Sequence, residues 1–332
     1  MTRQFCTLFD SGYLFKALAL YDSLERNAGS FHLTALCFDE DAARLLGLLA
    51  LPHLTVMPLT ELEAHDPGLA ATKADRNRFE YCCTATPALP LQLLESSPEL
   101  PEITYLDADL FFFSNPEPLF DEMGGASVLI TPHRFPGYLR HYAANGIYNV
   151  QFMTFRRDPR GLAVLRWWHD RCLEWCFLRL EDGKFADQKY LDDWPDRFKG
   201  VHVLRHPGGG AAPWNLDGHT LSHDDGRVLV DGEPLVFFHF HRVHMRFDGR
   251  YDWRVPGYLG LEAARELVYR PYLDALDHAK RRVRAVDPSF DAGLVKPPGW
   301  RQRVEDARAD VGVHVARLAP GLVRLRHRSV LS

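Results

Sequence analysis

The stretch EITYLDADLFFF, residues 102–113, sets two acidic residues between an apolar run and three aromatic residues. Residues 102–106 are typical of a strand that enters a hydrophobic core, and Phe111–Phe113 are predicted to continue it. Asp107 and Asp109 stand one residue apart, so in a strand their side chains point to the same face. Core packing gives no reason for two carboxylates at this place. The stretch therefore predicts a strand end whose acids bind a ligand.

Strands and helices alternate along the chain around this stretch. Apolar, β-prone runs predict further strands at residues 4–9, 31–38, 54–59, 126–133, 147–155, 201–206 and 234–241. Helical spacing and end signals predict helices at residues 13–26, 39–51, 84–97, 160–180, 184–198 and 261–286, with a turn at 60–68. This alternation predicts an α/β fold with a mostly parallel central sheet flanked by helices. Such sheets bind ligands beyond the carboxyl ends of their strands, where Asp107 and Asp109 fall.

The composition is that of an ordinary globular protein of 332 residues, 46% hydrophobic and 25% charged. A net charge of -5 gives no indication of nucleic-acid binding. The six cysteines show no metal-binding or redox spacing, so we interpret them as reduced thiols. No signal peptide and no membrane-spanning run is evident, and we expect a cytoplasmic protein.

The sequence changes character near Leu261. We expect a main domain over residues 1–260 and a helical C-terminal extension over residues 261–332 that ends in a basic tail. The tail interleaves Val and Leu with Arg301, Arg303, Arg308, Arg317, Arg324, Arg326 and Arg328. A basic amphipathic segment can lie on an anionic membrane, which predicts peripheral contact with the inner membrane face; a solvated tail is the alternative.

Two carboxylates at a strand end suit a hard divalent cation such as Mg²⁺ or Mn²⁺. Loop acids that cap backbone amides are the alternative. The wider sequence favours the cation, because residues 105–120, YLDADLFFFSNPEPLF, resemble the metal-binding DxD segment of GT-A nucleotide-sugar glycosyltransferases. The similarity is strongest to the branch with glycogenin and the bacterial lipopolysaccharide galactosyl- and glucosyltransferases. Four further segments occur in the family's order: TLFDSGYLFKALALYDSL (7–24), YNVQFMTF (148–155), DQKYLDDW (187–194) and VFFHFH (236–241).

The resemblance covers residues 4–247 and implies a GT-A fold, but the sequence departs from the family at three places. Gln151 stands where the relatives usually carry Gly, and HFHRVHMRF (239–247) replaces their diphosphate-gripping G-x-K-P-W run. The predicted helix before the DxD strand lacks the usual Arg or Lys. Positive charge could instead come from Lys73, Arg76, Arg78, Arg242 or Arg246. We therefore expect a divergent GT-A family.

The resemblance implies the site residues. Asp107, Asp109 and His239 are the expected metal ligands, with His241 as the rival histidine two residues on. An imidazole beside two carboxylates favours Mn²⁺ over Mg²⁺. The nucleotide donor is expected to contact Thr7, Phe9, Asp10, Tyr13, Lys73, Arg78, Asp107 and Ala108. Asp10 could instead, or in addition, cap the helix that follows it.

Four residues are expected at the reacting sugar. By resemblance, Asp187 binds hydroxyls of the donor sugar, although an Asp at this place could also be a helix N-cap. Gln188 cannot act as a base, but its amide oxygen can stabilise an oxocarbenium-like species, as a retaining transfer requires. Asn149 and Gln151 alternate onto one strand face and could contact sugar hydroxyls; a polar, solvent-facing strand is the alternative.

The acceptor is expected near His133, Trp214 and Asn215, although Trp214 could equally be a buried anchor for its loop. The glycines before that loop, Gly208–Gly210, lack the lysine and Ser/Thr of a phosphate-binding P-loop. The sequence thus predicts a metal-dependent, retaining glycosyltransferase that moves a sugar from a UDP-sugar to a glycan, lipid-linked or other hydroxyl acceptor. A nucleotide-sugar hydrolase and an inactive nucleotide-sugar-binding protein are the alternatives.

Overall fold

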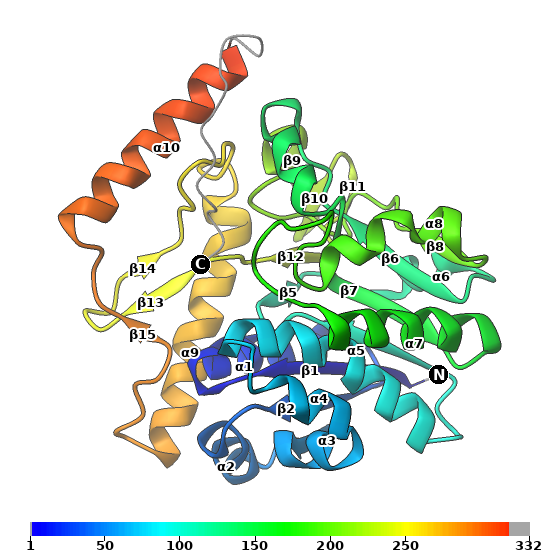
Figure 1. The fold of residues 1–332 in the computed structure, drawn as a ribbon. Coiled ribbons are helices and arrows are strands. Elements are labelled where there is room, and N and C mark those ends of the chain that lie inside the picture. Colours follow the sequence, from blue (N-terminus) through cyan, green and yellow to red (C-terminus); the bar gives the residue numbers. More distant parts are fainter. Residues whose placement is uncertain (1, 319–332) are drawn as a thin grey trace.

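The computed structural model describes residues 2–318, and a seven-stranded sheet runs through its centre (Figure 1). Strand β7 pairs antiparallel with β4 and β6, whereas the other pairs in this sheet are parallel. The predicted mostly parallel α/β sheet is therefore confirmed. In pairing order the strands are β3 (Leu54–Pro58), β2 (Phe31–Cys37), β1 (Arg3–Phe9), β4 (Glu102–Leu106), β7 (Tyr148–Arg156), β6 (Val128–Pro132) and β8 (Val201–Val203).

Helices connect these strands, and polar side chains begin several of them. The Asp39 side chain accepts the Ala42 N–H at the start of α2 (Glu40–Leu49). Asn77 and Glu80 form a capping box at the start of α5 (Arg78–Ser96). The other helices that surround the sheet are η1 (Ser11–Tyr13), α1 (Leu14–Asn27), α3 (Leu59–His65), α4 (Pro67–Thr72), α6 (Glu117–Met123), η2 (Gly137–Asn145), α7 (Pro159–Glu174), η3 (Gln188–Asp193), α8 (Trp194–Arg197) and η4 (Leu216–Gly218).

Proline positions explain where the predicted helices were wrong. The turn predicted at residues 60–68 instead contains most of α3 and the start of α4, and Pro67 occupies the first turn of α4, where its missing N–H costs nothing. Helix α5 contains Pro87 and Pro90 in its interior instead of beginning after them. Pro195 lies in the first turn of α8 and does not end a helix from residue 184. In these cases the prolines were interpreted as breaks when they lie inside or begin a helix.

The strand predicted over residues 102–113 is in fact two strands. β4 ends at Leu106, and β5 (Leu110–Phe112) leaves the main sheet to pair antiparallel with β12 (Phe237–His239). Residues 107–109 therefore form the turn that joins two sheets. The remaining strands form two small sheets, β11 (Glu233–Pro234) with β10 (Arg227–Val230) and β9 (Leu221–Asp224), and β14 (Tyr251–Asp252) with β13 (His244–Arg246) and β15 (Leu294–Val295).

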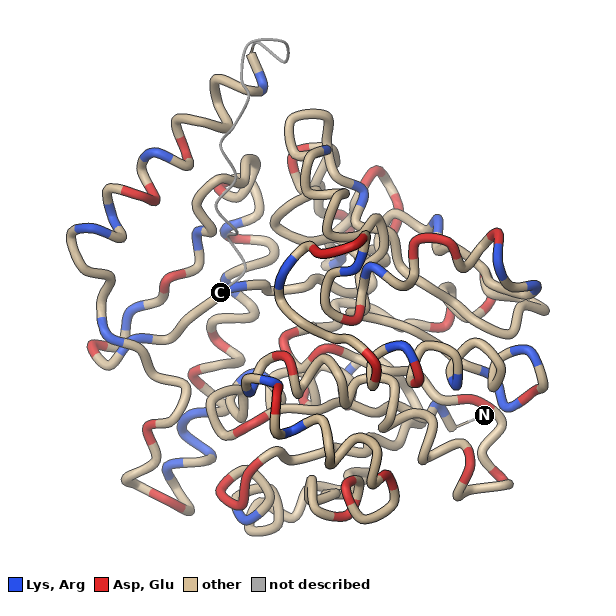
Figure 2. Tube along the Cα trace, in the orientation of Figure 1, with Lys and Arg blue, Asp and Glu red and all other residues tan. Residues whose placement is uncertain are grey.

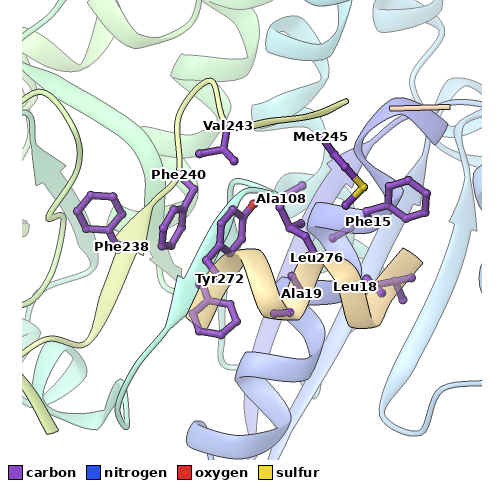
Figure 3. Close-up of a cluster of buried hydrophobic side chains, with 14 of the residues drawn as sticks. Phe15, Leu18, Ala19, Ala108, Phe238, Phe240, Val243, Met245, Tyr272 and Leu276 are labelled. Atoms are coloured by element: carbon purple, nitrogen blue, oxygen red, sulfur yellow. The ribbon is translucent and has the colours of Figure 1, made fainter. Parts of the chain in front are cut away.

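One apolar cluster joins the start of the chain to its late helices. It includes α1, β12 and α9 (Arg270–Val286), which follows the π-helical turn η5 (Arg265–Tyr269). Phe240 and Tyr272 stack in it with 3.7 Å between ring centroids, and Ala108 lies in the same cluster (Figure 3). The domain boundary at residue 260 stays a prediction, but α9 shares its core with α1.

The last described element is α10 (Trp300–Leu318), a second helix within the C-terminal extension that was expected to be helical and to end in a basic tail. The Gly257 N–H donates to Asp310 at 2.9 Å, which ties α10 to the preceding loop. Figure 2 shows basic and acidic residues interspersed along α10. Arg324, Arg326 and Arg328 of the predicted membrane-binding tail lie outside the described residues. Within residues 2–318, no helix is long and apolar enough to cross a membrane.

Candidate functional site

The turn between β4 and β5 carries the two acids at the carboxyl end of β4. The Asp107 N–H donates to the Gln151 carbonyl at 2.9 Å, which ties the turn to β7. The Tyr105 hydroxyl donates to Asp107 Oδ1 at 3.1 Å. Ala108 packs its methyl group into the core, so a ligand could reach it only through its backbone. The turn is thus held by backbone and core contacts, so the carboxylates of Asp107 and Asp109 remain available to bind a ligand.

Strand β12 brings His239 to these acids from more than a hundred residues away. Its register places His239 opposite Leu110 of β5. His239 Nε2 lies 3.0 Å from Asp109 Oδ1 and 3.8 Å from Asp107 Oδ2. Gln151 Oε1 accepts the Nδ1–H of His239 at 3.0 Å, which makes Nε2 the nitrogen that a metal can bind.

Charge and burial set different pKa values for the three groups. Burial raises the pKa of Asp107 to about 6, with His239 opposing the rise and Asp109 adding to it. Burial acts on Asp109 too, but the His239 charge and hydrogen bond outweigh it and hold the pKa of Asp109 below its usual range. Burial lowers the pKa of His239, but Asp109 outweighs that effect and raises it. Without a cation, His239 thus shares its proton with Asp109, and a divalent cation would replace that proton.

The donor set fits a divalent cation. One ligand atom from each of Asp107, Asp109 and His239 lies within 4.8 Å of the other two. Two carboxylates and one imidazole, with the imidazole oriented by a hydrogen bond from behind, suit Mn²⁺. His241 is not part of the cluster found among residues 2–318. Its ring instead packs edge-on against Trp214, and burial lowers its pKa to about 3.

A second polar cluster joins the residues that were predicted to bind the acceptor. Trp214 Nε1 and Asn215 Nδ2 donate to the His133 carbonyl at 2.9 and 3.0 Å. Asn149 Nδ2 donates to His133 Nε2 at 2.9 Å, so the proton of this neutral ring sits on Nδ1. Burial lowers the pKa of His133 to about 3. The Trp214 ring also contacts His239 edge-on at 5.2 Å, which links this cluster to the three predicted metal ligands.

Asp187 and Gln188 lie at the start of η3. Asp187 makes no side-chain capping hydrogen bond, so the N-cap interpretation is wrong. Burial, followed by the charge of Asp107, raises the pKa of Asp187 to about 7. Its carbonyl accepts the Trp168 indole N–H at 2.9 Å, and Gln188 Nε2 donates to the Asn145 carbonyl at 2.9 Å. The Asp187 carboxyl is therefore buried and feels the charge of Asp107, and the Trp168 hydrogen bond fixes the backbone that carries it.

No protein-family model matches this chain. YfnF of Bacillus subtilis (strain 168), an uncharacterized protein, is 34% identical over 306 residues, which cover 88% of this chain and 97% of YfnF. The chain belongs to the YfnF family. YfnD of the same organism, also uncharacterized, is 30% identical over 297 residues, or 89% of this chain and 95% of YfnD.

Solved structures extend this result to the fold. The galactosyltransferase LgtC, solved in complex with donor and acceptor sugar analogs, aligns with 90% of this chain and 99% of its own at a TM-score of 0.50. The sequence identity is 14%, so the likeness shows the fold alone. This YfnF-family chain has a divergent GT-A glycosyltransferase fold, which confirms the predicted resemblance and fold class.

The residues predicted to hold the nucleotide are spread over buried and exposed positions. Thr7 and Phe9 are buried in β1. Asp10 caps η1 through the Gly12 N–H, as its alternative role predicted, and also accepts Arg78 Nε at 2.7 Å. Tyr13 is 39% exposed. Asp10, Tyr13 and Arg78 thus keep exposed surface that a ligand could contact.

The remaining predicted donor contact, Lys73, is exposed as well and pairs with Glu63 at 2.8 Å. Two other residues were missed by the sequence reasoning. Asp39, at the end of the second strand, accepts Arg78 at 2.8 Å. Lys16 of α1 lies 3.7 Å from Asp109 Oδ2. The signal for Lys16 was a lysine inside the otherwise apolar run LFKALAL, residues 14–20.

Proposed function

We propose that this chain is a metal-dependent glycosyltransferase that uses a nucleotide sugar, most simply a UDP-sugar, and transfers to a hydroxyl acceptor on a glycan or lipid-linked glycan. The observation that carries the proposal is the cluster of Asp107, Asp109 and His239 at the carboxyl end of β4 in a GT-A fold. This is the sheet edge where α/β folds bind ligands.

In this proposal Asp107, Asp109 and His239 hold Mn²⁺ or Mg²⁺. The cation supplies charge neutralisation for the leaving diphosphate. Gln151 orients His239, and Tyr105 orients Asp107 through the hydroxyl hydrogen bond. The chain's own contribution is therefore to fix the ligand geometry before the donor arrives.

We assign Asp10, Tyr13 and Arg78 to the nucleoside, because Asp10 follows β1, Arg78 at the start of α5 pairs with it, and all three are partly exposed. The buried Asp187 binds hydroxyls of the donor sugar. Gln188 presents its amide oxygen to the reacting carbon in a retaining transfer, since its amide nitrogen is already used by Asn145.

The acceptor lies beside the cluster of His133, Trp214 and Asn215. Trp214 and Asn215 are nearly fully buried and hold the His133 backbone. His133 is as buried as they are, so all three support the acceptor site by fixing this loop, and a direct contact falls to more exposed residues around them.

The test is product analysis with the full chain, Mn²⁺ and a panel of nucleotide sugars, each with and without sugar acceptors. The proposal expects one donor whose nucleotide release is accelerated by an acceptor and appears together with a glycosylated product. Asp109→Asn should abolish this activity, whereas the exposed Asp121→Asn on α6 should retain it.

Two results would contradict the proposal. Nucleotide release at the same rate with every acceptor, and no glycosylated product, identifies a nucleotide-sugar hydrolase. Tight donor binding without any turnover identifies an inactive binding protein on the GT-A scaffold.

A further inference from the structure

The two carboxylate oxygens of Asp109 face different partners. Oδ1 lies 3.0 Å from His239 Nε2, and Oδ2 lies 3.7 Å from Lys16 Nζ. Lys16 projects from α1, and 10% of its side chain is exposed. A lysine charge thus lies next to the proposed metal ligands.

The contacts of Lys16 repay only part of the cost of burying its charge. Its Nζ is buried and makes no hydrogen bond among residues 2–318, and the ring of Tyr13 covers it at 3.9 Å. Its helix neighbours Phe15, Ala17 and Leu18 belong to the apolar core. Burial of an ammonium with one carboxylate at long range costs desolvation that the pair repays poorly. The position therefore indicates a role at the site.

The charge balance indicates that role. Asp107 and Asp109 together carry a charge of −2 when ionised, and Lys16 reduces this sum to −1, with His239 neutral as a metal ligand must be. A divalent cation bound to Asp109 would be repelled by Lys16 across a short, poorly hydrated distance. The diphosphate of a nucleotide sugar brings negative charge and further oxygen ligands, which offset this repulsion.

We propose that Lys16 is a built-in counter-ion of the Asp107–Asp109–His239 site that keeps its affinity for a divalent cation low until a donor diphosphate binds with the cation. This inference rests on the proposed function and deepens it. Lys16 acts through Asp109 and is a positioning residue. Cation and nucleotide then bind with positive coupling, so the site fills with both together.

The test is Mn²⁺ titration of the full chain, with free Mn²⁺ followed by electron paramagnetic resonance, first alone and then with saturating UDP. Lys16→Met should bind Mn²⁺ alone roughly ten-fold tighter or more than the wild type. The gain in Mn²⁺ affinity on addition of UDP should shrink by the same factor. Lys16→Gln serves as a second neutral variant, with thermal unfolding to establish that each is folded.

Two controls separate the local charge from general effects. Lys16→Arg keeps the charge and should keep the low Mn²⁺ affinity. The exposed Lys199→Met removes a surface charge and should leave Mn²⁺ affinity unchanged.

Unchanged Mn²⁺ affinity in folded Lys16→Met and Lys16→Gln overturns the inference. A loss of UDP affinity at unchanged Mn²⁺ affinity also overturns it, because Lys16 would then be a diphosphate ligand. If the wild type binds no Mn²⁺ either with or without UDP, that result contradicts the proposed metal-dependent function itself. If the wild type binds Mn²⁺ and UDP, and the Lys16 variants bind Mn²⁺ with the same affinity, only the counter-ion role of Lys16 is contradicted.

Discussion

Gln151 is completely buried in β7, and its side chain holds His239. We predict that Gln151→Leu weakens Mn²⁺ binding about 10- to 100-fold, because loss of the partner behind a metal-binding histidine frees the ring to turn. Isothermal titration with Mn²⁺ and UDP measures the effect.

A matched control is Gln92→Met, which changes another largely buried glutamine, on α5. The control should keep the wild-type Mn²⁺ affinity. If Gln151→Leu keeps that affinity and impairs only the use of the donor sugar, Gln151 is the sugar contact predicted from the sequence and not a support for His239.

The sequence identified some residues of the candidate metal site but not all of them. Asp107 and Asp109 could be identified from the sequence because charged residues stand out in a stretch that is otherwise apolar and aromatic. Their partner among the histidines could not be fixed, because the choice between His239 and His241 depends on the register of β12 against β5. The contact of Lys16 depends on where α1 packs, which local sequence does not encode.

At the scale of elements, the loop before β12 depends on Gly208. A Cβ added there would lie 1.9 Å from the Pro234 carbonyl oxygen, and the Gly208 carbonyl accepts the Val236 N–H. We predict that Gly208→Ala lowers the free energy of unfolding by about 1–3 kcal/mol, as expected for forced overpacking. Urea unfolding measures this change.

Gly47→Ala is the matched control, because Gly47 is exposed within α2 and has nothing within 4 Å of an added Cβ. It should raise the free energy of unfolding by about 0.5–1 kcal/mol through helix propensity. Equal unfolding midpoints for Gly208→Ala and the wild type would show that the loop moves freely to admit the methyl group.

Helices α4 and α7 are joined by a pair whose strength depends on pH. His169 Nε2 lies 2.6 Å from Asp66 Oδ2, and Asp170 also faces the ring. Burial lowers the pKa of His169, but the hydrogen bond and charge of Asp66 outweigh it and raise that pKa. Its stabilising contribution is therefore complete below about pH 6.5, the unfolded-state pKa, and is lost as the pH rises through the folded-state pKa.

We accordingly predict that His169→Gln is destabilised relative to the wild type by more at about pH 5.5 than at about pH 8.5. Thermal unfolding of both proteins at the two pH values measures the difference. The same deficit at both pH values would contradict a charged His169 in the folded protein at the lower pH.

Element types were easier to predict than element ends. Apolar, β-prone runs located β1, β2, β3 and β4, and β1, β2 and β4 are largely buried strands, which have a simple signature. The break between β4 and β5 had no such signature, since residues 110–113 are as apolar as the strand before them. The break depends on the pairing of β5 with a strand that follows more than a hundred residues later.

At the scale of the whole molecule, α9 completes the core over α1. Tyr272, Leu276 and Val283 are buried, and Phe15 contacts Phe290 edge-on at 5.5 Å. We predict that a chain ending at residue 260 loses cooperative unfolding and aggregates, because the apolar face of α1 is uncovered. A chain ending at residue 298 keeps α9 and should unfold cooperatively near the full-length midpoint.

Circular dichroism and size-exclusion chromatography compare the two truncated chains. A cooperative, monomeric 1–260 chain would establish the sequence-based boundary as a true domain limit. Local sequence could not decide this point. Periodicity predicts a helix over residues 261–286, of which α9 forms 270–286, but it does not show which helix α9 packs against.

The central claim is that Asp107, Asp109 and His239 form a divalent cation site that binds the donor diphosphate. The most direct measurement is isothermal titration of UDP into the wild type and Asp109→Asn, with Mn²⁺ or with EDTA. We expect UDP binding by the wild type to require Mn²⁺ and to weaken roughly 100-fold or more in Asp109→Asn, because one buried charged ligand is lost. Equal UDP affinity in Mn²⁺ and in EDTA, or in both proteins, would contradict it.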